Sequence, residues 1–279
     1  SIDSTGMFTA PTMPGVGMIT AINLAISGIA TVTIVPGAVN SVIINPNPVT
    51  LTVGGTQAFT TVAFDAYGNL VSGAAFIWTT NVGSVDSSGL FTAQTIPGTG
   101  IVTATNGSAS GSATITIIIG SLHHIIVSPD PATVAAGGTQ SFTATGYDTY
   151  NNLITGLSFA WITDIGSFDA FGLLTAQTIS GSGSVTATSG AISGTAVVIV
   201  IPGTLDHILV APSPATVLVS GIQLFTAIGY DTYNNVITGL TFAWSTDVGT
   251  VSDGLFIAQS MPGAGTLTAT NGAKSGFAT

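Results

Sequence analysis

The sequence contains no cysteine, no arginine and no glutamate, and its only basic residue is Lys274. Charged residues make up 4% of its 279 residues, against about 25% in an ordinary soluble domain. Without cysteine the chain has neither disulfide bonds nor thiol chemistry. With a net charge of −10, it also lacks the clusters of lysine and arginine that hold nucleic acid or an anionic membrane surface. The composition therefore argues against nucleic acid as a partner.

Long apolar runs are also missing, although 46% of the residues are hydrophobic and the mean hydropathy is +0.66. The longest run, residues 196–201, is far shorter than the about 20 residues of a membrane-spanning helix, so we expect no transmembrane segment. Valine, isoleucine, alanine and phenylalanine alternate with threonine, serine and glycine, a mixture that favours strands. Good helix formers such as glutamate, lysine and arginine are nearly absent. The fold class is predicted to be all-β.

The chain repeats itself with a period of 83 residues. The three tryptophans, Trp78, Trp161 and Trp244, are spaced by this period, and each belongs to a Phe-x-Trp triplet. Two further motifs recur with the same spacing: an Asp-x-Tyr-x-Asn turn, which begins at Asp65, Asp148 and Asp231, and a Pro-x-Pro pair, which begins at Pro46, Pro129 and Pro212. Repeats of this kind indicate a tandem array of small domains.

The repeat divides the chain into four segments. Residues 1–34 align with residues 84–117, and Thr279 aligns with Thr114. We therefore predict the C-terminal part of a preceding repeat at 1–36, repeat 1 at 37–119, repeat 2 at 120–202, and repeat 3, which lacks its last strand, at 203–279. Two explanations of these ends are open. The favoured one is a longer protein that continues in both directions, and the other is a second subunit that supplies the missing strands by strand addition.

Within repeat 1, turn signals separate short strand-like runs. Residues 42–44 and 51–53 are expected as strands on either side of the proline pair, and residues 57–65 as the longest strand. Phe76 and Trp78 are two positions apart, so they are predicted to share one face of a strand and to lie in the core. A tight turn is expected at 86–89, and the Asn-Gly pair at 106–107 is a strong hairpin signal. About seven strands in about 80 residues indicate an immunoglobulin-like β-sandwich.

Several of these motifs occur together in a known family. The segments are Pro-x-Pro-Ala-Thr, Gly-Gly-Thr-Gln-x-Phe-Thr-Ala, Trp-x-Thr-Asp-x-Gly, Gly-Leu-Phe-Thr-Ala and Gly-x-Gly-x-Val-Thr-Ala-Thr. Together they resemble the bacterial Ig-like domains, group 2 type, of prokaryotic adhesins, surface-layer (S-layer) proteins and intimin- or invasin-like stalks. The resemblance covers essentially the whole chain. It implies the fold and an extracellular or cell-surface location, but no catalytic residue, because the family serves as spacer, fibre and adhesive tip alike.

Histidines are the first candidates for chemistry. His123, His124 and His207 all lie in the expected linkers, and the residue of the first linker equivalent to His124 and His207 is Ser41. A catalytic group present in only two of three linkers is a poor basis for nucleophilic catalysis. We expect linker packing or exposure to solvent for these side chains, with metal binding between neighbouring domains as the alternative, and we expect no enzyme activity.

The Asp-x-Tyr-x-Asn turns are the second candidates. An Asp and an Asn four residues apart could supply oxygen ligands to Ca²⁺, but they fall short of the 6–8 oxygens that this ion takes. Both residues also favour turns by bonding their own backbone. A structural turn is the favoured interpretation and calcium the alternative. We therefore predict no catalytic, cofactor-binding or metal-binding residue.

Low surface charge suggests contacts with other proteins of the same kind, since soluble monomers disperse through charges of mixed sign. We expect a structural subunit or segment of an extracellular filament, sheath or surface layer. Its partners would be other copies of itself, head-to-tail and lateral, and glycans stay open as partners. The alternative is the stalk of a cell-surface adhesin that presents a binding tip.

Overall fold

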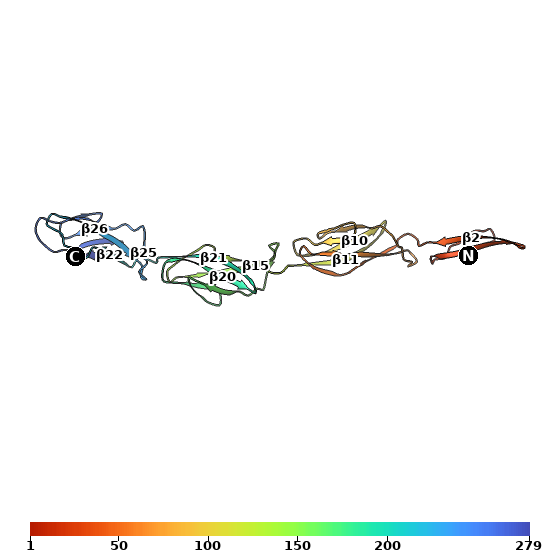
Figure 1. Ribbon diagram of the computed structural model, residues 1–279, viewed down its shortest axis with the longest axis horizontal. Coiled ribbons are helices and arrows are strands. Elements are labelled where there is room, and N and C mark those ends of the chain that lie inside the picture. Colours follow the sequence, from red (N-terminus) through yellow and green to blue (C-terminus); the bar gives the residue numbers. More distant parts are fainter. The chain divides into compact units, whose positions relative to one another are not determined.

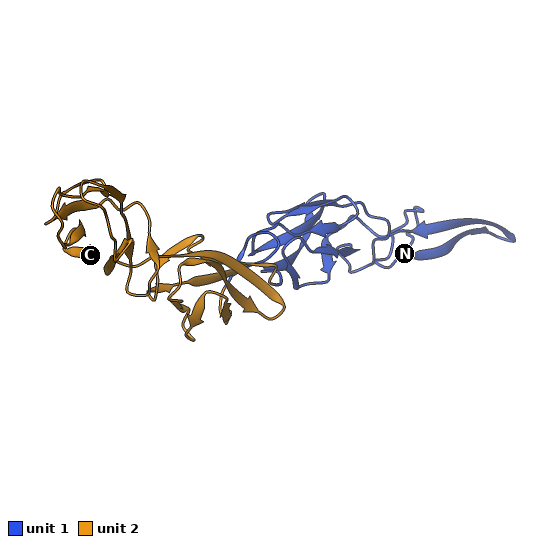
Figure 2. Cartoon of the chain, turned by 60° about the vertical axis from the view of Figure 1, so that its left-hand side comes forward, with its two compact units in different colours: residues 1–121, 147–154 blue, residues 122–146, 155–279 orange.

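A computed structural model describes residues 1–279 as an all-β chain of 30 strands without a helix. The predicted fold class is therefore confirmed. No helix is present that is long and apolar enough to cross a membrane. The chain forms two compact units: residues 1–121 with 147–154, and residues 122–146 with 155–279 (Figure 2). We keep the names repeat 1, 2 and 3 for the segments defined from the sequence.

Residues 1–36 form one antiparallel hairpin of strands β1 (Gly15–Asn23) and β2 (Ile26–Ile34). Its apolar side chains are mostly exposed; Val16 and Met18, for example, are each 73% exposed. An isolated bridge between Ile2 and Phe8 precedes the hairpin. This segment therefore has strands but no core of its own.

Repeat 1 holds nine strands in three sheets. The four-stranded sheet has the order β4-β11-β10-β7, with β4 parallel to β11 and all other pairs antiparallel. Strands β10 and β11 form the hairpin predicted at Asn106 and Gly107 (Figure 1). The bounds are β3 (Ser41–Asn45), β4 (Val49–Thr52), β5 (Thr56–Ala58), β6 (Thr60–Phe64), β7 (Ile77–Thr80), β8 (Ser84–Val85), β9 (Leu90–Thr92), β10 (Gly98–Asn106) and β11 (Ala109–Ile118).

One predicted strand is divided. Residues 57–65 were expected to form the longest strand, but β5 pairs with β9 while β6 pairs with β3. The change of partner occurs at Phe59, whose N–H donates to the carbonyl of Gly89, at 2.8 Å. The phenylalanine is 2% exposed, so the chain changes sheets at the point where this ring enters the core. The longest strands are instead β10 and β11.

The core of repeat 1 lies between the sheets and follows the period-2 alternation of its strands. Buried residues alternate with outward-facing ones in β11, where Ala113 and Ile115 are fully buried. Phe91 is fully buried as well, and its ring meets that of Phe59 edge-on at a centroid distance of 6.3 Å. Trp78 packs against this core but is only partly buried, so it covers one side of the core rather than filling its centre.

Repeat 2 has the strand plan of repeat 1 with one strand more, β16, where repeat 1 has an isolated bridge between Phe64 and Leu70. Its sheets have the orders β12-β15-β16, β13-β21-β20-β17 and β14-β19-β18, and β13 is parallel to β21. The bounds are β12 (His124–Ser128), β13 (Ala132–Ala135), β14 (Thr139–Ser141), β15 (Thr143–Tyr147), β16 (Leu153–Ile154), β17 (Ala160–Thr163), β18 (Gly166–Phe168), β19 (Leu173–Ala176), β20 (Gly181–Ser189) and β21 (Ile192–Ile201).

Repeat 3 has three three-stranded sheets, with the orders β22-β24-β25, β23-β28-β27 and β26-β29-β30. Residues 215–218, which correspond to β4 and β13, are not a strand here. The bounds are β22 (His207–Ala211), β23 (Ile222–Leu224), β24 (Thr226–Tyr230), β25 (Val236–Ile237), β26 (Ala243–Thr246), β27 (Thr250–Ser252), β28 (Leu255–Ile257), β29 (Leu267–Asn271) and β30 (Lys274–Ala278).

Candidate functional site at the Asp-x-Tyr-x-Asn turns

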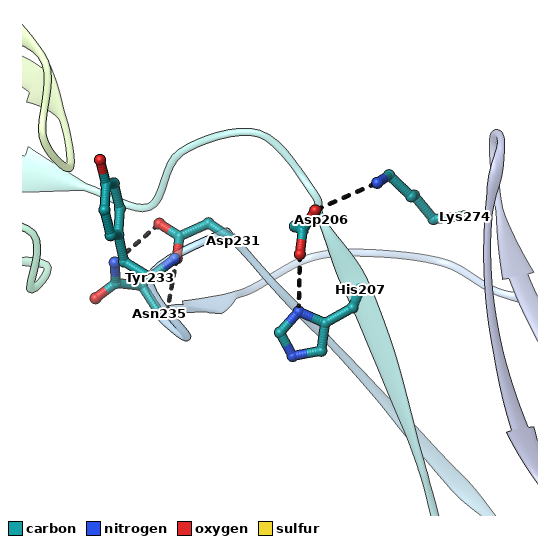
Figure 3. Close-up of polar contacts among 6 residues, drawn as sticks. All are labelled: Asp206, His207, Asp231, Tyr233, Asn235 and Lys274. Atoms are coloured by element: carbon teal, nitrogen blue, oxygen red, sulfur yellow. Dashed lines mark hydrogen bonds and ion pairs between the residues drawn. The ribbon is translucent and has the colours of Figure 1, made fainter.

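The Asp231 turn of repeat 3 is closed around a buried carboxylate. Oδ1 of Asp231 accepts the backbone N–H groups of Tyr233 and Asn235, at 2.8 and 2.9 Å. Its Oδ2 accepts the side-chain amide of Asn235 and the backbone N–H of Gly203, both at 2.8 Å. Figure 3 shows the carboxylate and the Asn235 amide facing each other while the Tyr233 ring points away. The aspartate thus ties its own turn to the linker that enters repeat 3.

The other two turns repeat this arrangement. Asp65 binds the linker N–H of Gly37 at 2.9 Å, and Asp148 binds that of Gly120 at 3.1 Å. The residue before each asparagine has a positive φ, which glycine and asparagine tolerate best. These residues are Gly68, Asn151 and Asn234, with φ of 81°, 64° and 65°. The motif therefore encodes one turn geometry three times.

The hydrogen bonds keep the three aspartates ionised. At Asp65 the side-chain amide of Asn69 is the main reason that the carboxyl pKa is lowered from 3.8 to about 2. At Asp148 and Asp231 burial raises the pKa, but the bonds from the asparagine amide and the backbone N–H groups outweigh it, so each pKa is again about 2. Hydrogen bonds to the charged form of a carboxyl have this effect in general.

The same bonds argue against the calcium alternative. N–H groups approach both oxygens of each carboxylate, in the positions that a bound cation would need. Ca²⁺ takes 6–8 oxygen ligands, and no cluster of three or more histidine, cysteine, aspartate or glutamate side chains that could hold a metal ion occurs in the chain. The geometry is that of a turn closed by its own N–H groups.

The outer side of each turn contacts the preceding segment of the chain. The Asn69 amide donates to the carbonyl of Thr12 at 2.7 Å, and the Asn152 amide donates to that of Thr95 at 2.8 Å. The Asn235 amide donates in the same way to the carbonyl of Thr178 at 2.7 Å. Each acceptor precedes its asparagine by 57 residues. Each turn is therefore a joint between consecutive segments, a role that we did not infer from the sequence.

The tyrosine of the turn supplies a second contact. The hydroxyl groups of Tyr150 and Tyr233 lie against Gly54 and Gly137 of the preceding repeat. A Cβ added at Gly137 would come within 2.6 Å of the Tyr233 hydroxyl. These tyrosines are 44% and 45% exposed, against 71% for Tyr67. In each preceding repeat, this glycine and the threonine carbonyl that accepts the asparagine amide lie against the turn. We call the two together the acceptor surface, and the glycine the acceptor glycine.

The joint into repeat 3 has one hydrogen bond more than the others. The backbone N–H of Ser180 donates to Oδ1 of Asn235 at 2.8 Å. Residues 14 and 97, which are equivalent to Ser180, are prolines and have no N–H to donate. The asparagine of this joint is 7% exposed and counts as buried.

We expect Ser180→Pro to loosen this joint. The other segments carry proline at the same place, so the backbone accepts it, and only the bond to Asn235 is lost. Amide hydrogen exchange in residues 231–235 should become faster by a factor corresponding to about 0.5–1.5 kcal/mol, the net value of one hydrogen bond. The matched reverse variant, Pro97→Ser, should slow exchange around Asn152. Unchanged exchange in both variants would contradict this account of the joint.

The histidines lie apart from the turns. His207 is close to Asp206 at 3.3 Å and stacks on Tyr230 at a centroid distance of 5.3 Å. Lys274 approaches the same aspartate at 3.4 Å (Figure 3), and both side chains are about half exposed, so this pair adds little stability. His123 contacts its neighbour His124 at 3.3 Å. These contacts match the expectation of packing or solvent exposure.

A cavity of about 580 Å³ opens in repeat 3, lined mainly by apolar side chains such as Val217, Phe225 and Phe256. In repeat 2 the residue equivalent to Val217 is Val134, which is paired with the buried Val200 of β21. The cavity therefore corresponds to the place that Val200 fills in repeat 2. Its lining belongs to the interior of the sandwich.

A curated protein is similar to this chain in sequence. Ice-binding protein 1 of Shewanella frigidimarina (strain NCIMB 400) is 29% identical over 198 residues, which make up 68% of this chain and 22% of that protein. The chain thus spans less than a quarter of the relative's length. No protein-family model matches the chain.

Solved structures with similarity include bacterial surface proteins. The Escherichia coli adhesin FdeC is 21% identical, with 85% of this chain and 94% of that chain covered and a TM-score of 0.41. Invasin, a bacterial integrin-binding protein, is 18% identical, with coverage of 96% and 65% and a TM-score of 0.43. Domains 1–6 of the surface-layer protein SbsC are 18% identical, with coverage of 98% and 47% and a TM-score of 0.30. The fold of this chain is established by its own strand topology.

Proposed function

We propose that the chain is a structural segment of an extracellular filament, sheath or surface layer built from stacked Ig-like domains, without catalysis. The observation that carries this proposal is the joint. The same buried aspartate, asparagine amide and linker glycine recur at each segment boundary, and every amide bonds a carbonyl of the segment before it. A contact that recurs in this way between neighbouring segments is typical of repeat arrays.

Exposed aliphatic residues at equivalent positions support lateral contacts with other copies. Ile43, Ile126 and Leu209 occupy the same position of the first strand in each repeat and are 56%, 51% and 55% exposed. With only 12 charged residues in 279, such sites have few neighbouring charges to keep water around them. Apolar surface that recurs with the repeat suits packing against copies with the same period.

A second candidate is the stalk of a cell-surface adhesin, and one face of repeat 3 favours it. The cross-strand pairs Ile222–Ile257 and Leu224–Leu255 of β23 and β28 are 44–64% exposed. The corresponding pairs of repeat 1 are Thr56–Thr92 and Ala58–Leu90. A repeat that departs from its neighbours on an outward face fits a receptor or glycan contact better than a uniform rod.

Negative-stain electron microscopy of the native material tests the two candidates. Filaments or sheets with a regular axial repeat would support the structural role, and they should persist with a calcium chelator because the turns are closed by N–H groups. Separate short particles at all protein concentrations would contradict it and favour the stalk.

The variant with Ile43→Thr, Ile126→Thr and Leu209→Thr tests the lateral contacts. We expect side-by-side bundles to disappear while single threads remain, because only the recurring aliphatic sites are removed. The matched control is Ile77→Thr with Ile162→Thr, which removes exposed aliphatic surface at positions 72% and 65% exposed that do not recur. Equal bundling in the triple variant and the control would refute the assignment of these sites.

A further inference from the structure

Repeat 3 differs from repeats 1 and 2 at the acceptor surface for the next tyrosine. The acceptor glycines Gly54 and Gly137 each have a φ of 69°. The equivalent residue of repeat 3 is Ser220, which keeps a φ of 57°, although this region is unfavourable for residues with a Cβ. A serine has therefore replaced glycine at a position where the backbone itself favours glycine.

The turn around this position is the same in the three repeats. The N–H of the acceptor residue donates to a glutamine carbonyl at 3.1, 3.0 and 3.1 Å in repeats 1, 2 and 3. The next N–H closes the turn onto the carbonyl three residues earlier at 2.9, 2.8 and 2.8 Å. Because the backbone is equivalent, the Cβ of Ser220 projects where a Cβ added at Gly54 or Gly137 would project.

That position is occupied at the two joints. A Cβ at Gly137 would approach the Tyr233 hydroxyl and the ring carbon Cζ to 2.6 and 2.9 Å, and a Cβ at Gly54 would come closer still to Tyr150. Contacts under 3.0 Å are not tolerated by a Cβ, so the tyrosine would have to move away. A side chain at the acceptor position of either joint would therefore displace the tyrosine that lies against it.

We propose that Ser220 prevents repeat 3 from accepting an Asp-x-Tyr-x-Asn turn in the way that repeats 1 and 2 accept one. The serine interrupts the series of tyrosine-docked joints at this repeat. The partner that fits this surface is a module with a small residue, such as glycine or alanine, in place of the tyrosine. This inference goes beyond the proposed function, since it applies equally to a filament and to a stalk.

The first test introduces the serine where the joint is present, as Gly137→Ser in the full chain. We expect hydrogen-exchange protection of residues 231–235 to be lost, with the rest of repeat 3 as protected as in the wild type. The matched control is Gly190→Ser, which has a φ of 61° and nothing within 4 Å of an added Cβ. Adding Tyr233→Ala to Gly137→Ser should restore protection, because the collision is relieved. Wild-type protection in Gly137→Ser, or loss of it in the control as well, would overturn the proposal.

The second test examines Ser220 itself. The full chain is fused in the register of the repeat, with Thr279 followed directly by residues 32–279 of a second copy, so that the second copy's Tyr67 meets residue 220. We expect residues 65–69 of the second copy to gain hydrogen-exchange protection with Ser220→Gly and not with Ser220. Equal protection in the two fusions would overturn the proposal. Filament formation is not measured in either test, so the outcome is separate from that of the proposed function.

Discussion

Asp231→Asn should lower the melting temperature of repeat 3 by about 10 °C or more, because buried N–H donors lose their acceptor. The carboxylate accepts four N–H groups and is fully buried. An amide in its place offers one oxygen and turns an NH₂ group toward donors that already point inward. Hydrogen exchange resolved by segment would show faster opening of residues 203–206 and 231–235 first.

The control for this experiment is Asp253→Asn, which removes the same charge in the same repeat from an exposed turn with a φ of 47°. Asparagine tolerates this backbone conformation, so the melting temperature should stay within a few degrees of the wild type. A similar effect of the two substitutions would show that charge alone, and not the hydrogen-bonded turn, stabilises the repeat.

Acid should destabilise all three repeats together between pH 4 and pH 2. Asp65, Asp148 and Asp231 have a pKa of about 2 in the folded chain, against 3.8 for an ordinary aspartate. A carboxyl with a lowered pKa stabilises the folded chain. This contribution is fully present at a pH above the pKa of the unfolded chain, and it is lost as the pH falls toward the pKa of the folded chain. Thermal unfolding followed by tryptophan fluorescence should therefore give nearly constant melting temperatures from pH 7 to pH 5 and a steep fall below pH 4.

A melting temperature that stays constant down to pH 2 would contradict this prediction. The Asp231→Asn chain provides an internal comparison, since its repeat 3 should lose less stability on acidification than repeats 1 and 2. Asp3, Asp86 and Asp206 also have a lowered pKa, but their side chains are exposed and solvent weakens their contribution.

The strands and turns of this fold follow closely from local sequence. Alternating apolar residues give the buried face of β11, and the Asn-Gly pair gives its hairpin with β10. The turn at Asp86 was predicted from the same kind of signal, and its Oδ1 accepts the N–H groups of Ser88 and Leu90 at 2.8 and 3.0 Å. Each of these features depends on residues close together in the chain, for which spacing and turn chemistry are sufficient.

Long-range features could not be predicted in this way. Nothing local in residues 57–65 indicates that the strand changes sheets at Phe59, because the cause is the carbonyl of Gly89, 30 residues later. The joint was missed for the same reason. Asn69 and Thr12 are 57 residues apart, and the only signal was that a Gln-Thr or Pro-Thr pair recurs in step with the turns. The acceptor in each case is a backbone carbonyl, which leaves no mark on the side-chain sequence.

The parallel pairing in repeats 1 and 2 determines how these two repeats respond to tension. In repeat 1, β4 near the start and β11 at the end run side by side in the same direction, from Val49 beside Ile115 to Thr52 beside Ile118. The entry of β4 and the exit of β11 therefore point opposite ways along one ladder. A force that pulls on both ends of the repeat loads these hydrogen bonds in shear, so that they must break together and not one after another. Repeat 2 has the same arrangement in β13 and β21, so repeats 1 and 2 each place a pair of strands that is loaded in shear between their two ends, whereas residues 215–218 of repeat 3 form no such strand.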